Sequence, residues 1–266
     1  MLTLSRHGDR DHIAVLTLDR PAAMNAVSTD FARQISATMG EVGADQGVSV
    51  VVLQSSSHRA FCVGADLKER QHFSQEQLLA HRVISRAAYR SVLDLPVPAV
   101  AAIDGYALGG GLELALSCDL IVASSSAMLA LPEVSVGLIP GGGGTQLLTR
   151  RVGWSAAASM IFTAARLDAD AAHQLGLVDA VVAGGLAGPA ALALAEQIGA
   201  NSPVALREAK RAMRHGSDID LGEALDIEDL CWRATATSAD RQEGIAAFNE
   251  KRSPRWHSPQ STRITP

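Results

Sequence analysis

The sequence predicts an α/β fold with largely parallel strand pairing, followed by an all-helical C-terminal segment. Short apolar, β-rich runs alternate with helical patterns in the first half of the chain, an order typical of α/β layer folds. From about Thr149 onward, helical patterns dominate instead. The chain has 266 residues, of which 47% are hydrophobic and 19% charged. This composition indicates a globular protein with a sizeable core and excludes a disordered chain.

The first elements follow from local patterns. Residues 13–18 form a short apolar run that ends at Asp19-Arg20-Pro21, which predicts a strand. Ser28 is placed to cap a helix that carries apolar residues about every 3.6 positions. A continuous β-branched run over 48–53 predicts a strand with both faces buried. The apolar face of the helix comprises Phe31, Ile35, Met39 and Val42.

The next helix carries a clear start signal. Ser74 and Gln77 have the spacing of a capping box, and the helix that they open is expected to reach about Leu93, since prolines follow. Beyond it we expect a strand, a helix and a second strand, at 100–103, from Gly109 onward and at 119–123.

Glycines and one proline divide the C-terminal half. Ser202-Pro203 supplies a cap and a proline at the first helical position, so a helix begins there. We therefore predict a core over 1–200 and a helical segment over 201–266, with an irregular tail from about 254. Helix stops are expected at Gly153, Gly176 and Gly199.

Charge and cysteine content narrow the class of protein. The net charge is −5, so general attraction to nucleic acid is not expected. No uncharged apolar run approaches the length of a membrane span, and residues 1–11 carry charges where a signal peptide needs an apolar stretch. The cysteines (Cys62, Cys118 and Cys231) are odd in number and widely spaced, without metal-type pairing. These features predict a reduced, cytoplasmic protein that does not bind a membrane.

Three glycine-rich stretches are the most informative part of the sequence. They lie at 61–67, 104–113 and 131–145, and none matches a dinucleotide-binding fingerprint or a phosphate-binding loop. In the second, a strand leads through Gly109-Gly110-Gly111 into a helix. Free backbone N–H groups at such a junction are the donors that an oxyanion hole requires, and glycine lets a carbonyl group approach closely. Tight turns and close packing remain the alternative explanation.

Two glutamates accompany these stretches. Glu113 lies near the first turn of the helix that follows Gly111, and Glu133 follows Pro132 in an otherwise apolar segment. A pair of carboxylates can activate water at one carbon and deliver a proton to the next. The spacing is equally compatible with a glutamate that only stabilises a helix start and with a solvated loop glutamate.

Five segments together resemble the crotonase superfamily, and within it the enoyl-CoA hydratases. They span nearly the whole chain and occur in the family's order. The segments are RPAAMNA at 20–26, FCVGADLKE at 61–69, LPVPAVAAIDGYALGGGLELALSCD at 95–119, PEVSVGLIPGGGGTQ at 132–146 and AFNEKR at 247–252.

The resemblance implies a spiral of ββα units with a helical C-terminal trimerisation segment. It also implies the reversible addition of water to a 2-trans-enoyl-CoA, giving a 3-hydroxyacyl-CoA, as in fatty acid metabolism, without a metal or redox cofactor. The N–H groups of Ala65 and Gly110 would form the oxyanion hole. Glu113 would act as the base toward water, and Glu133 would deliver a proton to the α-carbon.

Coenzyme A binding is likewise implied by the resemblance. Phe248 and Lys251 match residues that a neighbouring subunit donates, in a homotrimer or a dimer of trimers. Segment 71–90 is expected to form one wall of the acyl pocket. The expected substrate-binding residues are Met24, Ala26, Ala65, Asp66, Leu67, Lys68, Gly110, Phe248 and Lys251.

Other activities stay open at this point. The motifs are closest to the 3-methylglutaconyl-CoA hydratase branch, and an enoyl-CoA isomerase is a further alternative. A non-enzymatic module that binds CoA or RNA is an alternative of another class, since one helical face gathers basic residues. A solvated or interface-lining role explains the same face. The face comprises Arg207, Lys210, Arg211 and Arg214.

Overall fold

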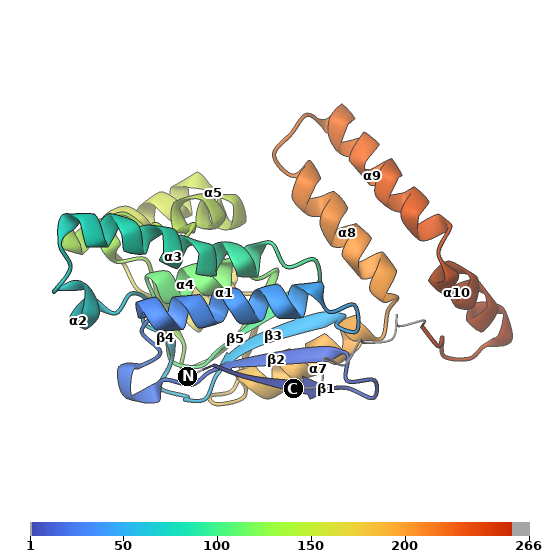
Figure 1. Ribbon diagram of the computed structural model, residues 1–266, viewed down its shortest axis with the longest axis horizontal. Helices are drawn as coiled ribbons and strands as arrows, with labels where there is room; N and C mark the ends of the chain where they lie inside the picture. Colours follow the sequence, from blue (N-terminus) through green and yellow to red (C-terminus); the bar gives the residue numbers. More distant parts are fainter. Residues whose placement is uncertain (1, 257–266) are drawn as a thin grey trace.

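Two β-sheets form the centre of the computed structural model, which describes residues 2–256 (Figure 1). The larger sheet has the strand order β1-β2-β3-β5-β7-β10, and the smaller has the order β4-β6-β8-β9. The larger sheet comprises β1 (Leu2–His7), β2 (Ile13–Leu18), β3 (Val50–Ser55), β5 (Ala99–Ile103), β7 (Leu120–Ser124) and β10 (Ala180–Val182). The smaller comprises β4 (Ala60–Cys62), β6 (Tyr106–Leu108), β8 (Met128–Ala130) and β9 (Leu167–Asp168).

The chain alternates between the two sheets as it advances. β3, β5 and β7 lie side by side in one sheet, while β4, β6 and β8, each next in sequence, lie side by side in the other. All these pairings are parallel, and only β1–β2 and β8–β9 are antiparallel. Each turn of the chain therefore adds one strand to each sheet, which confirms the predicted spiral of ββα units.

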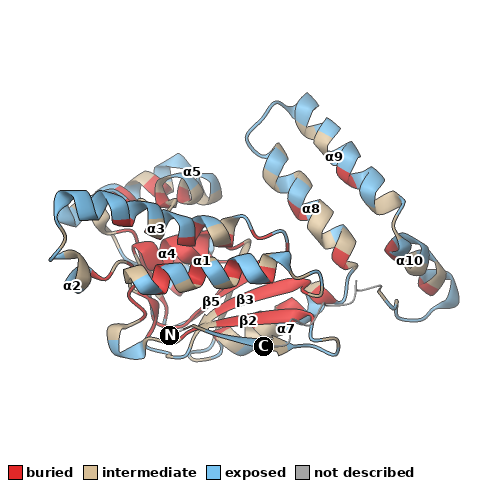
Figure 2. Cartoon of the chain, viewed as in Figure 1, coloured by how far each residue is buried: buried red, intermediate tan, exposed pale blue. Residues whose placement is uncertain are grey.

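The larger sheet is covered on both faces. Helices α1 (Thr29–Ala44) and α3 (Gln75–Leu93) lie over one face, and α7 (Ala187–Gly199) packs on the other. Alternate residues of a strand enter the two cores: Val51 and Leu53 lie in one, Val50 and Val52 in the other. This explains why the sequence at 48–53 is continuously apolar. Figure 2 shows the resulting buried strands between the half-exposed helices.

Local signals placed the long helices correctly. Ser28 caps α1 by accepting a hydrogen bond from the Phe31 N–H. Ser74 and Gln77 form both hydrogen bonds of the capping box at the start of α3. The remaining helices of the core are η1 (Pro21–Ala23), α2 (Leu67–Arg70), α4 (Gly110–Leu116), η2 (Glu133–Val136), α5 (Gly144–Thr163) and α6 (Ala169–Gln174).

Several short strands were not predicted. β4, β6 and β8 have three residues each, too few for a periodic pattern, and they owe their conformation to pairing with one another. β1 was also missed, as were β9 and β10, two very short strands in the segment after Thr149 in which helices dominate as predicted. The helix stop predicted at Gly153 is confirmed, because α5 consists of two helical stretches that meet at this residue, with φ 80° and ψ 165°.

The C-terminal helices extend away from the core (Figure 1). They are α8 (Pro203–Gly216), α9 (Leu221–Ala236) and α10 (Ala239–Glu250). As predicted, α8 begins with the Ser202 cap and Pro203. Residues 254–256 belong to no helix or strand, and the rest of the predicted tail, 257–266, lies outside the described residues. Within residues 2–256, no helix has the length and apolar character needed to cross a membrane.

Most of the basic face of α8 turns toward the core. Lys210 is only 8% exposed, and its Nζ donates to Asp119 Oδ2 at 2.6 Å and to the Val97 carbonyl at 2.8 Å. Arg214 donates to Asp119 Oδ1, and Arg207 donates to backbone carbonyls beside β3. Three of the four basic residues thus anchor the helix within the chain, which removes the observation that favoured an RNA-binding face.

The Asp119–Lys210 contact yields a stability prediction. Asp119→Asn would leave a nearly buried ammonium group without its counter-charge, so we expect the free energy of unfolding to fall by about 2–3 kcal/mol. Asp229→Asn, which breaks an exposed pair with Arg233, is the control and should cost less than about 1 kcal/mol. Urea unfolding followed by circular dichroism measures both. Equal losses in the two variants would contradict this role for Asp119.

Candidate active site

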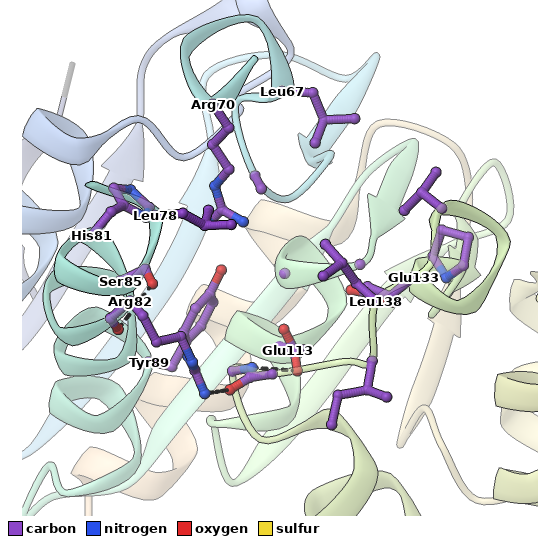
Figure 3. A pocket seen from close by; sticks show the side chains of 18 of the residues that line it. Leu67, Arg70, Leu78, His81, Arg82, Ser85, Tyr89, Glu113, Glu133 and Leu138 are labelled. Atoms are coloured by element: carbon purple, nitrogen blue, oxygen red, sulfur yellow. Dashed lines mark hydrogen bonds between the residues drawn. The ribbon is translucent and has the colours of Figure 1, made fainter. Parts of the chain in front are cut away.

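A cavity of about 490 Å³ lies where the smaller sheet meets α2 and α3. Four segments line it, within 63–70, 78–89, 109–113 and 132–142, so all three glycine-rich stretches and α3 contribute. Figure 3 shows side chains from α2 and α3 facing Glu113 and Glu133 across the cavity. Much of the wall is apolar, formed by Val63, Leu67, Leu78, Leu79, Val136, Leu138 and Ile139.

The spiral brings the three glycine-rich stretches together. β4, β6 and β8 run parallel, and a glycine-rich stretch contains or follows the carboxyl end of each of them. The carboxyl ends of neighbouring parallel strands lie at the same edge of a sheet, so residues 63–66, 109–111 and 131–133 become neighbours. The sequence separation between these residues gave no sign of this contact. The repeated strand pairing produces it.

Two backbone N–H groups face the cavity from the first two loops. An ideal Cβ on Gly64 would lie 2.8 Å from the Gly110 nitrogen, so the loops touch at these glycines. Gly64 has φ +85° and Gly109 has φ +52°, conformations that suit glycine. Among the described residues, the N–H groups of Ala65 and Gly110 have no hydrogen-bond acceptor. Both residues line the cavity, which is the arrangement expected of an oxyanion hole.

Glu113 is a buried carboxylate held by the third glycine-rich stretch. It lies on α4 and is 3% exposed. Its Oε1 accepts hydrogen bonds from Gly142 N–H at 2.6 Å and Gly144 N–H at 2.8 Å. Burial raises the pKa of Glu113, and these two hydrogen bonds act against that rise. The glycines have a clear purpose here, because an ideal Cβ on either would lie within 2.9 Å of the carboxylate.

Glu133 has a different environment. It begins η2, directly after Pro132, and its buried Oε2 has no hydrogen-bond partner among the described residues. Burial, together with the charge of Glu113, raises the pKa of Glu133 to about 7. Two carboxylates therefore line one cavity: Glu113 is held by two glycine N–H groups, and Glu133 has one buried oxygen without a partner. At neutral pH a large share of Glu133 carries a proton, which suits a general acid.

The predicted substrate-binding residues fall into groups. Leu67 lines the cavity together with Ala65 and Gly110. Met24 lies against the same loop, since its carbonyl accepts from the Val63 N–H, and Ala26 is buried nearby. Lys68 is exposed on α2.

The other predicted substrate contacts lie outside the cavity. The Asp66 side chain is occupied elsewhere: it caps α2 and pairs with Arg20 at 2.7 Å. Phe248 is 83% exposed on α10 and Lys251 caps the end of this helix, which lies on the opposite side of the molecule from α2 and α3 (Figure 1). Their contact with CoA from a neighbouring copy stays a prediction.

Several polar side chains at the cavity were missed from the sequence. Arg70 reaches in from α2, while His81, Arg82 and Tyr89 come from α3. Segment 71–90 was predicted to form one wall of the acyl pocket, and it does line this cavity, but no residue in it was singled out. The available signal was helical spacing, because the buried residues of α3 are His81, Ser85, Ala88, Tyr89 and Val92.

All three cysteines are free and buried. Cys62 and Cys118 are buried, and burial raises the pKa of each thiol to about 12, which keeps it protonated. Cys62 Sγ donates to the Asn25 carbonyl behind the 63–66 loop. It packs there and does not face the cavity.

Comparison with known proteins identifies the family. The model of the enoyl-CoA hydratase/isomerase family matches residues 8–259. The chain belongs to this family. Putative enoyl-CoA hydratase/isomerase YngF of Bacillus subtilis is 44% identical over 244 residues, covering 91% of this chain and 93% of YngF. Human mitochondrial methylglutaconyl-CoA hydratase is 41% identical, over 94% of this chain and 76% of its own. The crystal structure of an enoyl-CoA hydratase from Bacillus anthracis superposes with a TM-score of 0.93 at 36% identity, covering 96% of this chain and 98% of that one.

The raised pKa of Glu133 predicts a pH-dependent cost in stability for this member of the family. The pKa of Glu133 is about 7 in the folded protein and 4.5 for an unperturbed glutamate, as in the unfolded chain. Ionisation of Glu133 therefore opposes folding. The cost grows from about pH 4.5 to pH 7 and is complete above it. Glu133→Gln should therefore raise the free energy of unfolding by about 1–2 kcal/mol at pH 8, since solvent screens part of the cost at this half-buried group, and by little at pH 4.5.

Urea unfolding at several pH values measures this difference. The exposed Glu223→Gln serves as the control, with the same loss of one charge outside the cavity. A stability gain for Glu133→Gln that is the same at pH 4.5 and pH 8 would contradict the prediction.

Proposed function

We propose that this protein catalyses the reversible addition of water to a 2-trans-enoyl-CoA, giving a 3-hydroxyacyl-CoA. The observation that carries the proposal is the meeting of buried Glu113, half-buried Glu133 and two unpaired backbone N–H groups around one cavity. Hydration needs a base for water, an acid for the α-carbon and stabilisation of the charge on the thioester oxygen. The cavity offers a group for each task.

The first step follows from the position of each group. The thioester oxygen accepts hydrogen bonds from the N–H groups of Ala65 and Gly110, which stabilise the enolate-like charge that develops as water adds. Glu113, ionised and oriented by Gly142 and Gly144, takes a proton from the water that attacks the β-carbon. Its Oε2 is the oxygen left free by these two donors.

Glu133 completes the addition. It enters the reaction protonated, a state that its raised pKa favours near neutral pH, and delivers the proton to the α-carbon. After addition, Glu113 holds a proton and Glu133 is ionised. The pair returns to its starting state when the proton passes from Glu113 to Glu133 through the next bound water. The two glutamates therefore titrate and act as one unit.

Replacement of each glutamate tests the proposal. We expect the wild-type protein to remove the enoyl-thioester absorbance of crotonyl-CoA. Glu113→Gln and Glu133→Gln should each lower kcat by about 10³-fold or more, because each removes one proton-transfer group. Circular dichroism confirms that the variants are folded. A folded wild-type protein that hydrates no enoyl-CoA, or a Gln variant with full activity, would overturn the proposal.

The assembly belongs to the same proposal. We expect a homotrimer or a dimer of trimers, in which α10 of one copy brings Phe248 and Lys251 to the CoA of another. Large apolar side chains exposed on the C-terminal helices support this expectation, since an interface would bury them. They include Leu221, Leu225, Leu230, Trp232 and Ile245. A protein that gel filtration shows to be monomeric would exclude the intersubunit role of Lys251. The cytoplasmic location stays a prediction.

One observation favours a narrower substrate, an enoyl chain that ends in a carboxylate. The Arg70 guanidinium lines an otherwise largely apolar wall, and its buried Nε has no partner among the described residues. Figure 3 shows it pointing into the cavity. An unpaired cation in such a place favours an anionic ligand group. Relatives named methylglutaconyl-CoA hydratase fit this alternative.

Arg70→Met separates the two substrate classes. For glutaconyl thioesters we expect kcat/KM to fall about 30-fold, because a charge-assisted hydrogen bond is lost, and for hex-2-enoyl thioesters to change less than about threefold. N-acetylcysteamine thioesters, which lack the CoA phosphates, distinguish carboxylate binding from phosphate binding. Arg86→Met, on the exposed side of α3, is the control. Equal losses for both acyl groups would exclude a carboxylate-binding role.

A further inference from the structure

Tyr89 is a buried tyrosine at the centre of the cavity that the proposed mechanism leaves unused. It lies on α3, is 5% exposed and lines the cavity (Figure 3). Its ring packs beside Gly142, where an ideal Cβ would lie 2.7 Å from both the ring and Glu113 Oε2. The carbon edge of the ring, and not the hydroxyl, is therefore the part next to the Glu113 carboxylate.

The hydroxyl lies at the junction of the two oxyanion loops. A Cβ added to Gly110 would overlap Tyr89 Oη, so this oxygen occupies the space that a side chain at position 110 would take. The same point is 3.4 Å from Gly64 Cα. Tyr89 Oη thus lies beside the two glycines whose contact sets Ala65 N–H and Gly110 N–H side by side. This placement also explains why position 110 must be glycine.

The Tyr89 hydroxyl can donate a hydrogen bond, but none of the described residues accepts one from it. The hydroxyl is also not one of the fully buried atoms without a partner, so it is open to the cavity that Tyr89 lines. Burial and the nearby charge of Glu113 raise the pKa of Tyr89, which keeps the group neutral and able to donate. An acceptor must therefore come from a molecule that enters the cavity.

We propose that Tyr89 is the third donor of the oxyanion hole, its hydroxyl bonding the same thioester oxygen as the N–H groups of Ala65 and Gly110. This inference rests on the acyl-CoA site proposed above. The hydrogen bond from a third donor becomes stronger as negative charge develops on the thioester oxygen. It therefore stabilises the transition state more than the bound substrate. Glu113 and Glu133 remain the groups that move protons, and Tyr89 keeps its own.

Tyr89→Phe tests the inference, because it removes the hydroxyl and keeps the ring. We expect kcat/KM for crotonyl-CoA to fall about 10- to 100-fold, below the effect of removing a glutamate. The specific readout is spectroscopic. Hydrogen bonds to the carbonyl oxygen of a bound, conjugated enoyl-CoA draw electrons toward it and shift its absorbance to longer wavelength. With 4-dimethylaminocinnamoyl-CoA as probe, the red shift should be smaller in Tyr89→Phe than in the wild type.

Tyr106→Phe is the matched control, since Tyr106 is 37% exposed on β6 and does not line the cavity. It should keep the wild-type red shift and rate. A wild-type red shift in Tyr89→Phe overturns the inference whatever the rate, because packing alone would then explain the tyrosine. The red shift requires binding and no turnover, so it also tests Tyr89 if crotonyl-CoA is not hydrated, an outcome that would contradict the proposed function and not this donor.

Discussion

The Glu113 carboxylate and the two backbone N–H groups that hold it are the contact on which the rest of the site depends. A carboxylate buried to this degree is costly unless hydrogen bonds compensate for lost water. The donors come from Gly142 and Gly144, and close approach is possible only because these residues lack a side chain. The glycine-rich run thus orients one oxygen of Glu113 and leaves the other available. Unlike the backbone N–H groups of a phosphate-binding loop, those of Gly142 and Gly144 bind a carboxylate of the same chain.

The site also depends on the different surroundings of Glu113 and Glu133. Both carboxylates line the same cavity, yet Glu113 has backbone donors and Glu133 has a buried oxygen without one. Burial raises both pKa values, and the charge of Glu113 raises that of Glu133 further. Two identical side chains therefore lie in different environments, because only Glu113 accepts hydrogen bonds from Gly142 N–H and Gly144 N–H. That asymmetry supports a base and an acid in one reaction without a further titrating group.

The architecture accounts for the meeting of these groups. Each turn of the spiral adds one short strand to the smaller sheet, and the loops after β4, β6 and β8 emerge at one edge. One loop supplies Ala65, the next Gly110 and Glu113, and the third Glu133. On the opposite side of the cavity, helix α3 contributes His81 and Tyr89. Loops and the helices next to them supply the residues of the candidate site, while the larger sheet and its two apolar cores form the scaffold behind them.

The sequence by itself determined the local features and the chemistry of the motifs. The Ser28 cap, the Ser74–Gln77 capping box and the buried strand near 48–53 follow from neighbouring residues, so they could be predicted. Glu113 and Glu133 were found because they lie in glycine-rich segments that resemble a known family. Their placement around one cavity agrees with that expectation, while their roles remain the proposal.

Tertiary structure alone decided the rest, because those features depend on residues far apart in the chain. The three-residue strands β4, β6 and β8 exist only through pairing with one another. The sequence of α8 is compatible with a solvated basic face. In the structure, Lys210 on this face donates a hydrogen bond to Asp119, 91 residues away, and the face packs against the core. Arg70 and Tyr89 join the site because α2 and α3 pack across from α4. Burial sets the surroundings of both side chains and, together with the charge of Glu113, the pKa of Glu133, and no local sequence pattern encodes burial.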